Sequence, residues 1–124
     1  MNFNNVMIGS GNAKQLVEYY TKLFGKPEYE EGDSAGWELG QGHLSVGPHS
    51  EVHGKNAHPG RMLINIETND VKGESERLKA AGAIVVREPY GFEDVPGAAI
   101  ATLADPDDNY FQLMSPMGPE QATT

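Results

Sequence analysis

One internal repeat constrains the fold of this chain more than any other feature. Residues 2–25 show the pattern of a strand, an amphipathic helix and a closing glycine, and residues 62–82 repeat that order. Alternating patterns typical of strands follow each helix. In the first copy they cover 27–31, 35–40 and 43–48, and in the second 84–89, 98–104 and 109–114. Each half is therefore predicted as a βαβββ module of an α+β fold.

The first copy has the stronger helix signal. In the first strand, Val6 and Ile8 alternate with Asn5 and Met7, which is the period of a strand. Asn12 is a predicted N-cap with Gln15 as its capping-box partner, and Gly25 suits the position after the helix. Between these ends, apolar residues recur at helical spacing, namely Ala13, Leu16, Val17, Tyr20, Leu23 and Phe24.

The second copy has the same order with a thinner apolar helix face. Asp70 is its predicted N-cap and Gly82 ends the helix, while Val71, Leu78 and Ala81 form the apolar stripe. In the preceding strand, Met62, Ile64 and Ile66 are predicted to occupy one face, and Leu63, Asn65 and Glu67 the other.

A chain of 124 residues suits a single domain with its own core. We predict one domain over 1–116, with module one at about 2–48, a connecting loop at 49–60 and module two at about 62–115. The stretch 117–124 is expected to form a flexible tail. The same pattern also allows an unrelated α+β sandwich with two helices on one face.

Composition excludes several classes of partner. Nine Lys and Arg against eighteen Asp and Glu give a net charge of −9, which argues against nucleic acid and against anionic membrane surfaces. The absence of cysteine excludes a disulfide framework and a thiolate metal site. The chain shows neither an apolar run long enough to span a bilayer nor a signal peptide at residues 1–5. A cytoplasmic globular protein is therefore expected.

Four stretches resemble the motifs of one known superfamily. They are Tyr-Tyr-Thr-Lys-Leu-Phe-Gly at 19–25, Asn-Asp-Val at 69–71, Glu-Arg-Leu-Lys-Ala-Ala-Gly at 76–82 and Asp-Pro-Asp-Asp-Asn-Tyr-Phe-Gln-Leu at 105–113. With the paired modules, they resemble the vicinal oxygen chelate superfamily of glyoxalases, bleomycin-resistance proteins and extradiol dioxygenases. The resemblance covers 2–116. The superfamily usually has glycine where Asp108 stands, and Asp enters left-handed backbone conformations more readily than most residues.

The resemblance implies a cup-shaped mixed sheet. In this superfamily one strand face packs on the helices and the other lines the cup, where metal-dependent members hold a divalent cation as a Lewis acid. The alternation along each strand then separates the two faces. The residues predicted to face the cup are Asn5, Met7, His43, Ser45, Leu63, Asn65, Glu67, Tyr110, Gln112 and Met114.

The metal ligands of the superfamily are missing from the matching positions. Those positions fall on Asn5, Ser45, Leu63 and Gln112, which include neither a carboxylate nor an imidazole. We therefore expect no metal cofactor, and neither glyoxalase I chemistry nor extradiol ring cleavage. A shifted register would place His43 or Glu67 beside the site, so a divalent metal stays a disfavoured alternative.

The four histidines allow two interpretations. His43, His49, His53 and His58 lie within sixteen residues, and such a group could form a second metal site or a proton shuttle. The favoured interpretation is that they are solvated loop residues, with His43 alone lining the cup.

Aromatic residues outside the first helix are further candidates for ligand contact. The stretch 90–97 is predicted as an irregular loop at the cup rim, where Tyr90 and Phe92 would contact a ligand. Trp37 and Tyr110 could stack on a planar ligand or pack in the core.

These observations favour a metal-free protein that binds an aromatic or cationic small molecule in the cup and forms a homodimer, as bleomycin-resistance proteins do. The predicted ligand-binding residues are Asn5, Met7, His43, Ser45, Leu63, Asn65, Glu67, Tyr90, Phe92, Tyr110 and Gln112. The alternative is a lyase or isomerase related to lactoylglutathione lyase, with His43 or Glu67 as general base. A regulatory domain without a tight ligand is the third hypothesis.

Overall fold

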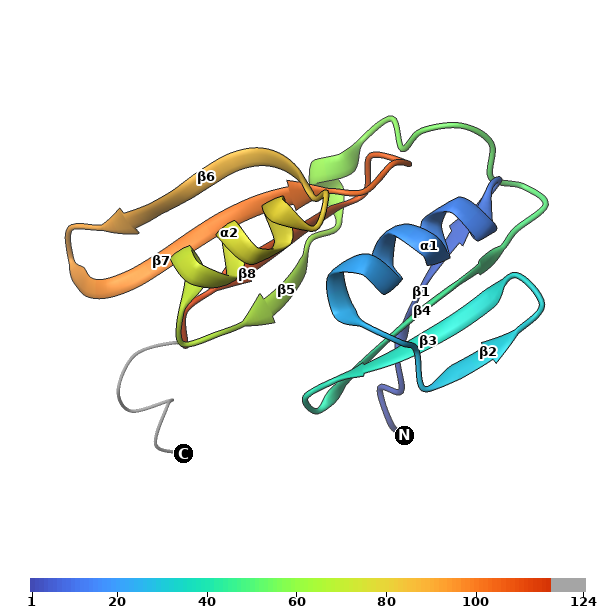
Figure 1. Ribbon diagram of the computed structural model, residues 1–124, viewed down its shortest axis with the longest axis horizontal. Helices are drawn as coiled ribbons and strands as arrows, with labels where there is room; N and C mark the ends of the chain where they lie inside the picture. Colours follow the sequence, from blue (N-terminus) through green and yellow to red (C-terminus); the bar gives the residue numbers. More distant parts are fainter. Residues whose placement is uncertain (117–124) are drawn as a thin grey trace.

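Both predicted modules are present in the computed structural model, which describes residues 1–116 (Figure 1). The first contains β1 (Val6–Ser10), α1 (Ala13–Phe24), β2 (Tyr29–Glu31), β3 (Ser34–Leu39) and β4 (Gly42–Pro48). A short 3₁₀ turn, η1 (Pro59–Arg61), precedes the second module. That module contains β5 (Ile64–Glu67), α2 (Val71–Ala80), β6 (Ile84–Phe92), β7 (Val95–Ala104) and β8 (Tyr110–Met114). The predicted tail at 117–124 lies outside the described residues.

Each module forms its own four-stranded mixed sheet. The order is β1-β4-β3-β2 in the N-terminal sheet and β5-β8-β7-β6 in the C-terminal sheet. In both, the first strand runs parallel to the last and the other pairs are antiparallel. Each sheet carries its helix on one face, with β5 on the side of its sheet that faces the first module (Figure 1). The α+β fold with two βαβββ modules is confirmed.

The predicted boundaries of α1 are correct, but its capping contacts differ from a capping box. The backbone N–H of Gln15 donates to the Asn12 side chain, at 3.4 Å. The Gln15 side chain accepts from the Asn12 side-chain amide, and the Asn12 backbone N–H donates to the Ser10 hydroxyl instead. Gly25 follows the helix at φ +88°, a conformation that side chains rarely adopt.

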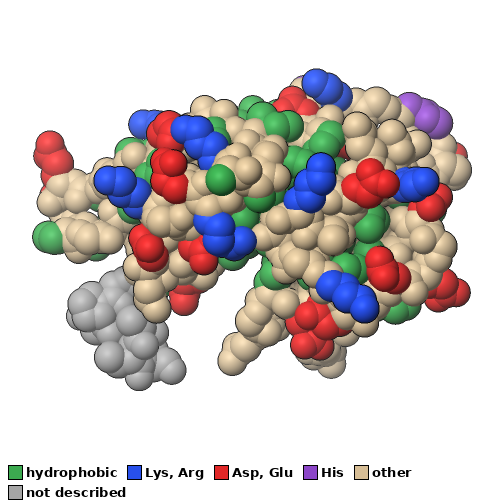
Figure 2. All heavy atoms as spheres, viewed as in Figure 1, with side chains coloured by type: hydrophobic (Ala, Val, Ile, Leu, Met, Phe, Trp, Pro, Cys, Tyr) green, Lys and Arg blue, Asp and Glu red, His purple; other side chains and the backbone are tan. Residues whose placement is uncertain are grey.

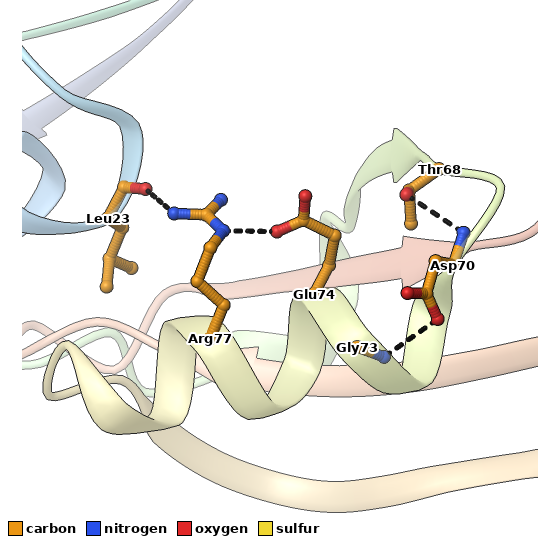
Figure 3. Close-up of polar contacts among 6 residues, drawn as sticks. All are labelled: Leu23, Thr68, Asp70, Gly73, Glu74 and Arg77. Carbon is orange, nitrogen blue, oxygen red and sulfur yellow. Dashed lines mark hydrogen bonds and ion pairs between the residues drawn. The ribbon is translucent and has the colours of Figure 1, made fainter.

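The N-terminus of α2 is capped as predicted, since the N–H of Gly73 donates to the Asp70 carboxylate at 2.9 Å (Figure 3). Val71 and Leu78 are buried on the inner face of α2. Ser75 is buried beside them, and its hydroxyl has no hydrogen-bond partner among the described residues. Neither α1 nor α2 is long and apolar enough to cross a membrane.

The core lies between the helices and the sheet faces that they cover. An aromatic cluster occupies its centre, where the Tyr20 ring lies 5.6 Å from that of Phe24, 6.1 Å from Trp37 and 6.0 Å from Phe111. Trp37 is 2% exposed and its indole N–H donates to the Gly25 carbonyl, so this residue packs in the core and does not contact a ligand in the cup.

Side-chain hydrogen bonds join the two modules. The Tyr20 hydroxyl donates to the Asp105 carboxylate at 2.6 Å, and the Tyr19 hydroxyl donates to the Ala104 carbonyl at 2.6 Å. On the helix side, the Arg77 guanidinium donates to the Leu23 carbonyl at the end of α1 (Figure 3). Asp105 is 2% exposed, and this burial raises the pKa of its carboxyl above the ordinary value.

The prediction of an irregular loop at 90–97 is wrong. β6 extends through Phe92 and β7 begins at Val95, so only Glu93 and Asp94 form the turn between the two strands. Three register shifts, or β-bulges, interrupt the pairing of β6 with β7. β-Bulges bend a strand without ending it. The Gly and Pro residues of this hairpin are therefore compatible with continuous strands, although they resemble the pattern of a loop.

Candidate functional site

A cleft of about 1040 Å³ lies along the seam between β1 and β5. Its walls include apolar side chains that are exposed to solvent: Met7 is 55% exposed and Leu63 is 43% exposed. Amide side chains of Asn5 and Asn65 stand among them, and Glu67 supplies a carboxylate. An apolar surface with a few polar groups is typical of small-molecule sites.

The strands place these residues through their alternation and pairing. Met7 pairs with Ser45 across β1 and β4, and Asn65 pairs with Gln112 across β5 and β8. Their sequence neighbours Ile8, Leu44, Val46, Phe111 and Leu113 are buried in the core. The predicted separation of the strand faces is therefore correct, although Asn5 and Leu63 lie just before their strands rather than within them.

Most predicted ligand-binding residues come together at the cleft, and the rest lie elsewhere. Those that line it are Asn5, Met7, His43, Leu63, Asn65, Glu67 and Tyr110. Ser45, Tyr90, Phe92 and Gln112 do not line it. The cleft is also bordered by Phe3, Met62 and the turn at 40–42, none of which was predicted to contact a ligand. The glycines at 40 and 42 signalled the turn, but no local pattern indicated its place beside the seam.

The segment at 49–60 contributes Asn56 to the wall of the cleft. The backbone N–H of Asn56 donates to the Asp107 carbonyl at 2.8 Å, and the Asn56 side chain donates to that of Asn109 at 3.1 Å. Asn56 and Asn109 both line the cleft. The connecting segment is thus fixed to the β7–β8 turn and forms part of the wall.

The donor set at the superfamily metal position does not suit a divalent cation. The predicted ligand positions Asn5, Ser45, Leu63 and Gln112 offer two amides and a hydroxyl, and Leu63 has no donor atom. Their strand-paired neighbours Met7 and Asn65 add only a thioether and an amide. None of these groups supplies the charge or the imidazole nitrogen that such ions favour. Nowhere in residues 1–116 do three His, Cys, Asp or Glu side chains gather in a way that could hold a metal.

The two candidate bases have different surroundings. His43 Nε2 lies 3.5 Å from the carboxylate of Glu38 on the neighbouring strand, and both side chains are about half exposed or more. Glu67 lies at the end of β5 and also lines a second hollow of about 470 Å³ on the helix side. The bond from Arg77 to the Leu23 carbonyl joins the two modules at that second hollow.

The open face of the C-terminal sheet carries a row of polar residues beyond the cleft. Asn65 pairs with Gln112, Gln112 with Thr102 and Thr102 with Arg87. The Gln112 side-chain amide donates to the Thr102 hydroxyl at 3.1 Å. By contrast, the helix-bearing face of the molecule shows Lys and Arg interspersed with Asp and Glu (Figure 2).

The fold and the cleft define a protein with the paired-module cup of the vicinal oxygen chelate superfamily. A sequence profile described as a glyoxalase-like domain matches residues 5–114, so the chain belongs to this family. A sequence search of curated proteins gives no match.

Solved structures share the fold at low sequence identity. A glyoxalase-related enzyme from Fulvimarina pelagi is 19% identical with a TM-score of 0.72, and the match covers 98% of this chain and 95% of that one. The fosfomycin resistance protein FosX from Mesorhizobium loti is 14% identical with a TM-score of 0.70, covering 99% and 98%. A glyoxalase/bleomycin resistance protein/dioxygenase family enzyme from Burkholderia phytofirmans is 22% identical with a TM-score of 0.62, covering 90% and 94%.

Proposed function

We propose that this protein binds a small organic molecule in the cleft between β1 and β5 without a metal ion. The single observation that carries the proposal is the cleft itself, with a volume of about 1040 Å³ and exposed apolar side chains on both strands that border it. This volume suits a drug-sized ligand. The donor set described above supports binding without a metal.

The lining favours a ligand with a flat apolar or aromatic body. Met7 and Leu63 offer apolar surface on opposite sides of the seam, and Tyr110 adds an aromatic ring. The Glu67 carboxylate would attract a positively charged group, as the net charge of −9 also does over a longer range. An aromatic ligand, with or without a cationic group, is therefore the class that we propose.

Fluorescence titration with the neutral dye N-phenylnaphthylamine tests this site. Leu63→Asp should weaken dye binding about tenfold because it places a charge in the apolar wall. Val95→Asp is the matched control, since Val95 is also 43% exposed but does not line the cleft. Equal effects of the two variants, or no binding by the unmodified protein, would contradict the proposal.

Two further measurements separate binding from catalysis. Elemental mass spectrometry of protein purified without a His-tag should find no stoichiometric divalent metal. Incubation with the adduct of a 2-oxoaldehyde and a thiol should give no product. Turnover that is lost in Glu67→Gln or His43→Ala would instead support the lyase or isomerase hypothesis, because both residues line the cleft.

A further inference from the structure

The polar row of the C-terminal sheet ends at a cation on the open face. Directly opposed residues of neighbouring strands share a face, so Arg87 lies on the same face as Thr102 and Gln112. Leu103, next to Thr102, is fully buried on the opposite face that α2 covers. A register shift between Val85 and Arg87 brings the arginine to the open face.

Aromatic side chains hold the Arg87 side chain on this face. Its guanidinium carbon lies 3.8 Å from the centre of the Tyr90 ring. The Tyr90 ring packs edge-on against Phe92 at 5.5 Å, which supports the ring in turn. A guanidinium that rests on an aromatic ring keeps N–H donors for a second partner and is pre-organised for planar anions.

The acidic side chains of this region do not neutralise Arg87. Within the described part of the chain, no ion pair includes it, and the neighbouring Glu88 pairs with Lys79 at 2.8 Å. Glu67 lies on β5, three strand spacings away, which corresponds to about 14 Å. Glu93 and Asp94 form the turn three and four residues beyond Tyr90, on whose ring the guanidinium rests, which corresponds to about 10–13 Å along the strand.

We propose that Arg87 forms an anion subsite, which binds a carboxylate, sulfonate or similar group of the molecule whose apolar body occupies the cleft. This inference rests on the proposed function and adds an anionic group to its aromatic ligand, at a distance from the Glu67 carboxylate. Gln112 donates to the Thr102 hydroxyl at 3.1 Å, so the polar row that leads from the cleft toward Arg87 is internally hydrogen-bonded. The row from Asn65 to Arg87 spans about 14 Å, which sets the length of the ligand.

Two related dyes test the subsite. Anilinonaphthalene sulfonate carries an anionic group, whereas N-phenylnaphthylamine has the same aromatic parts without it. Arg87→Ala should weaken binding of the sulfonate dye about tenfold, as expected for loss of a charge-assisted hydrogen bond, and leave binding of the neutral dye unchanged. Arg87→Lys should retain most of the affinity because it keeps the charge.

Lys79→Ala is the matched control for net charge. It changes the charge by the same amount as Arg87→Ala, but Lys79 lies on α2 and pairs with Glu88. The subsite proposal would be overturned if both variants weakened binding of the sulfonate dye equally, or if Arg87→Ala had no effect on it. In either case, binding of the neutral dye would leave the cleft proposal intact. Failure of the neutral dye to bind the unmodified protein would overturn both proposals.

Discussion

Tyr20→Phe should remove one hydrogen bond between the modules and little else. The substitution keeps the ring that packs against Phe24, Trp37 and Phe111, and deletes only the hydroxyl that donates to Asp105 at 2.6 Å. Both partners are nearly inaccessible to water, with exposures of 1% and 2%. A hydrogen bond to a charged group contributes about 1.5–3 kcal/mol, so the free energy of unfolding should fall by about 2–3 kcal/mol at pH 7.

The pH dependence of this loss follows from the Asp105 carboxyl. Burial raises its pKa in the folded protein, so the folded state holds this proton more tightly than the unfolded state does. The contribution of Asp105 to stability is therefore fully present below its ordinary pKa of 3.8 and decreases as the pH rises through the raised folded value. The Tyr20 bond lowers that folded pKa. Removal of the bond raises the pKa of Asp105 further. The loss in free energy of unfolding caused by Tyr20→Phe should therefore be larger at pH 7 than at pH 4.

Urea denaturation followed by the fluorescence of the single tryptophan, Trp37, measures both effects. Tyr19→Phe is the neighbouring control. It loses uncharged bonds to Ala104 and Ile84, and should cost about 1 kcal/mol with little change between the two pH values. Equal losses in the two variants at both pH values would refute the view that a buried charge-assisted bond joins the modules.

Four further substitutions test local features of the fold by urea or thermal denaturation. Asp70→Ala removes the cap that accepts from Gly73 and should destabilise the protein by about 1 kcal/mol; an unchanged midpoint would contradict this. Asp108→Gly should stabilise it by about 0.5–1 kcal/mol, because Asp108 adopts φ +63° and glycine does so without strain; a lower melting temperature would show that the aspartate side chain matters more. Ser75→Ala should be neutral or stabilising because the buried hydroxyl lacks a partner among the described residues, whereas Leu78→Ala at the same helix face should cost about 2–5 kcal/mol.

Local patterns in the sequence were sufficient to predict the order of the helices and strands, although not the full length of β6 and β7. The N-caps at Asn12 and Asp70 and the alternation along β1, β4, β5 and β8 depend on neighbours in the chain, so one sequence predicts them well. The same alternation identified Met7, Asn65 and Glu67 as residues of the open face. These residues lie together at one cleft, and the repeat had indicated which strands are related.

The missed features depend on contacts between distant parts of the chain. Phe3 and Met62 border the cleft through the approach of β1 to β5, which no local pattern reports. The position of Arg87 illustrates a second limit. Strict alternation from Val85, which packs on the core, places Arg87 on the helix-covered face, and the bulge between these residues reverses that assignment. A single extra residue in a strand therefore moves a charged side chain to the opposite face from the one that strict alternation predicts.

The separation of the two sheets affects how the sequences of the two modules can evolve. Within residues 1–116, β1 pairs only with β4 and β5 pairs only with β8, so the strand pairing of each half lies within that half. An altered side chain on the open face of one half leaves the other half's strand pairing intact. The open faces of the two halves are thus free to change independently, while the cleft between β1 and β5 keeps contributions from both.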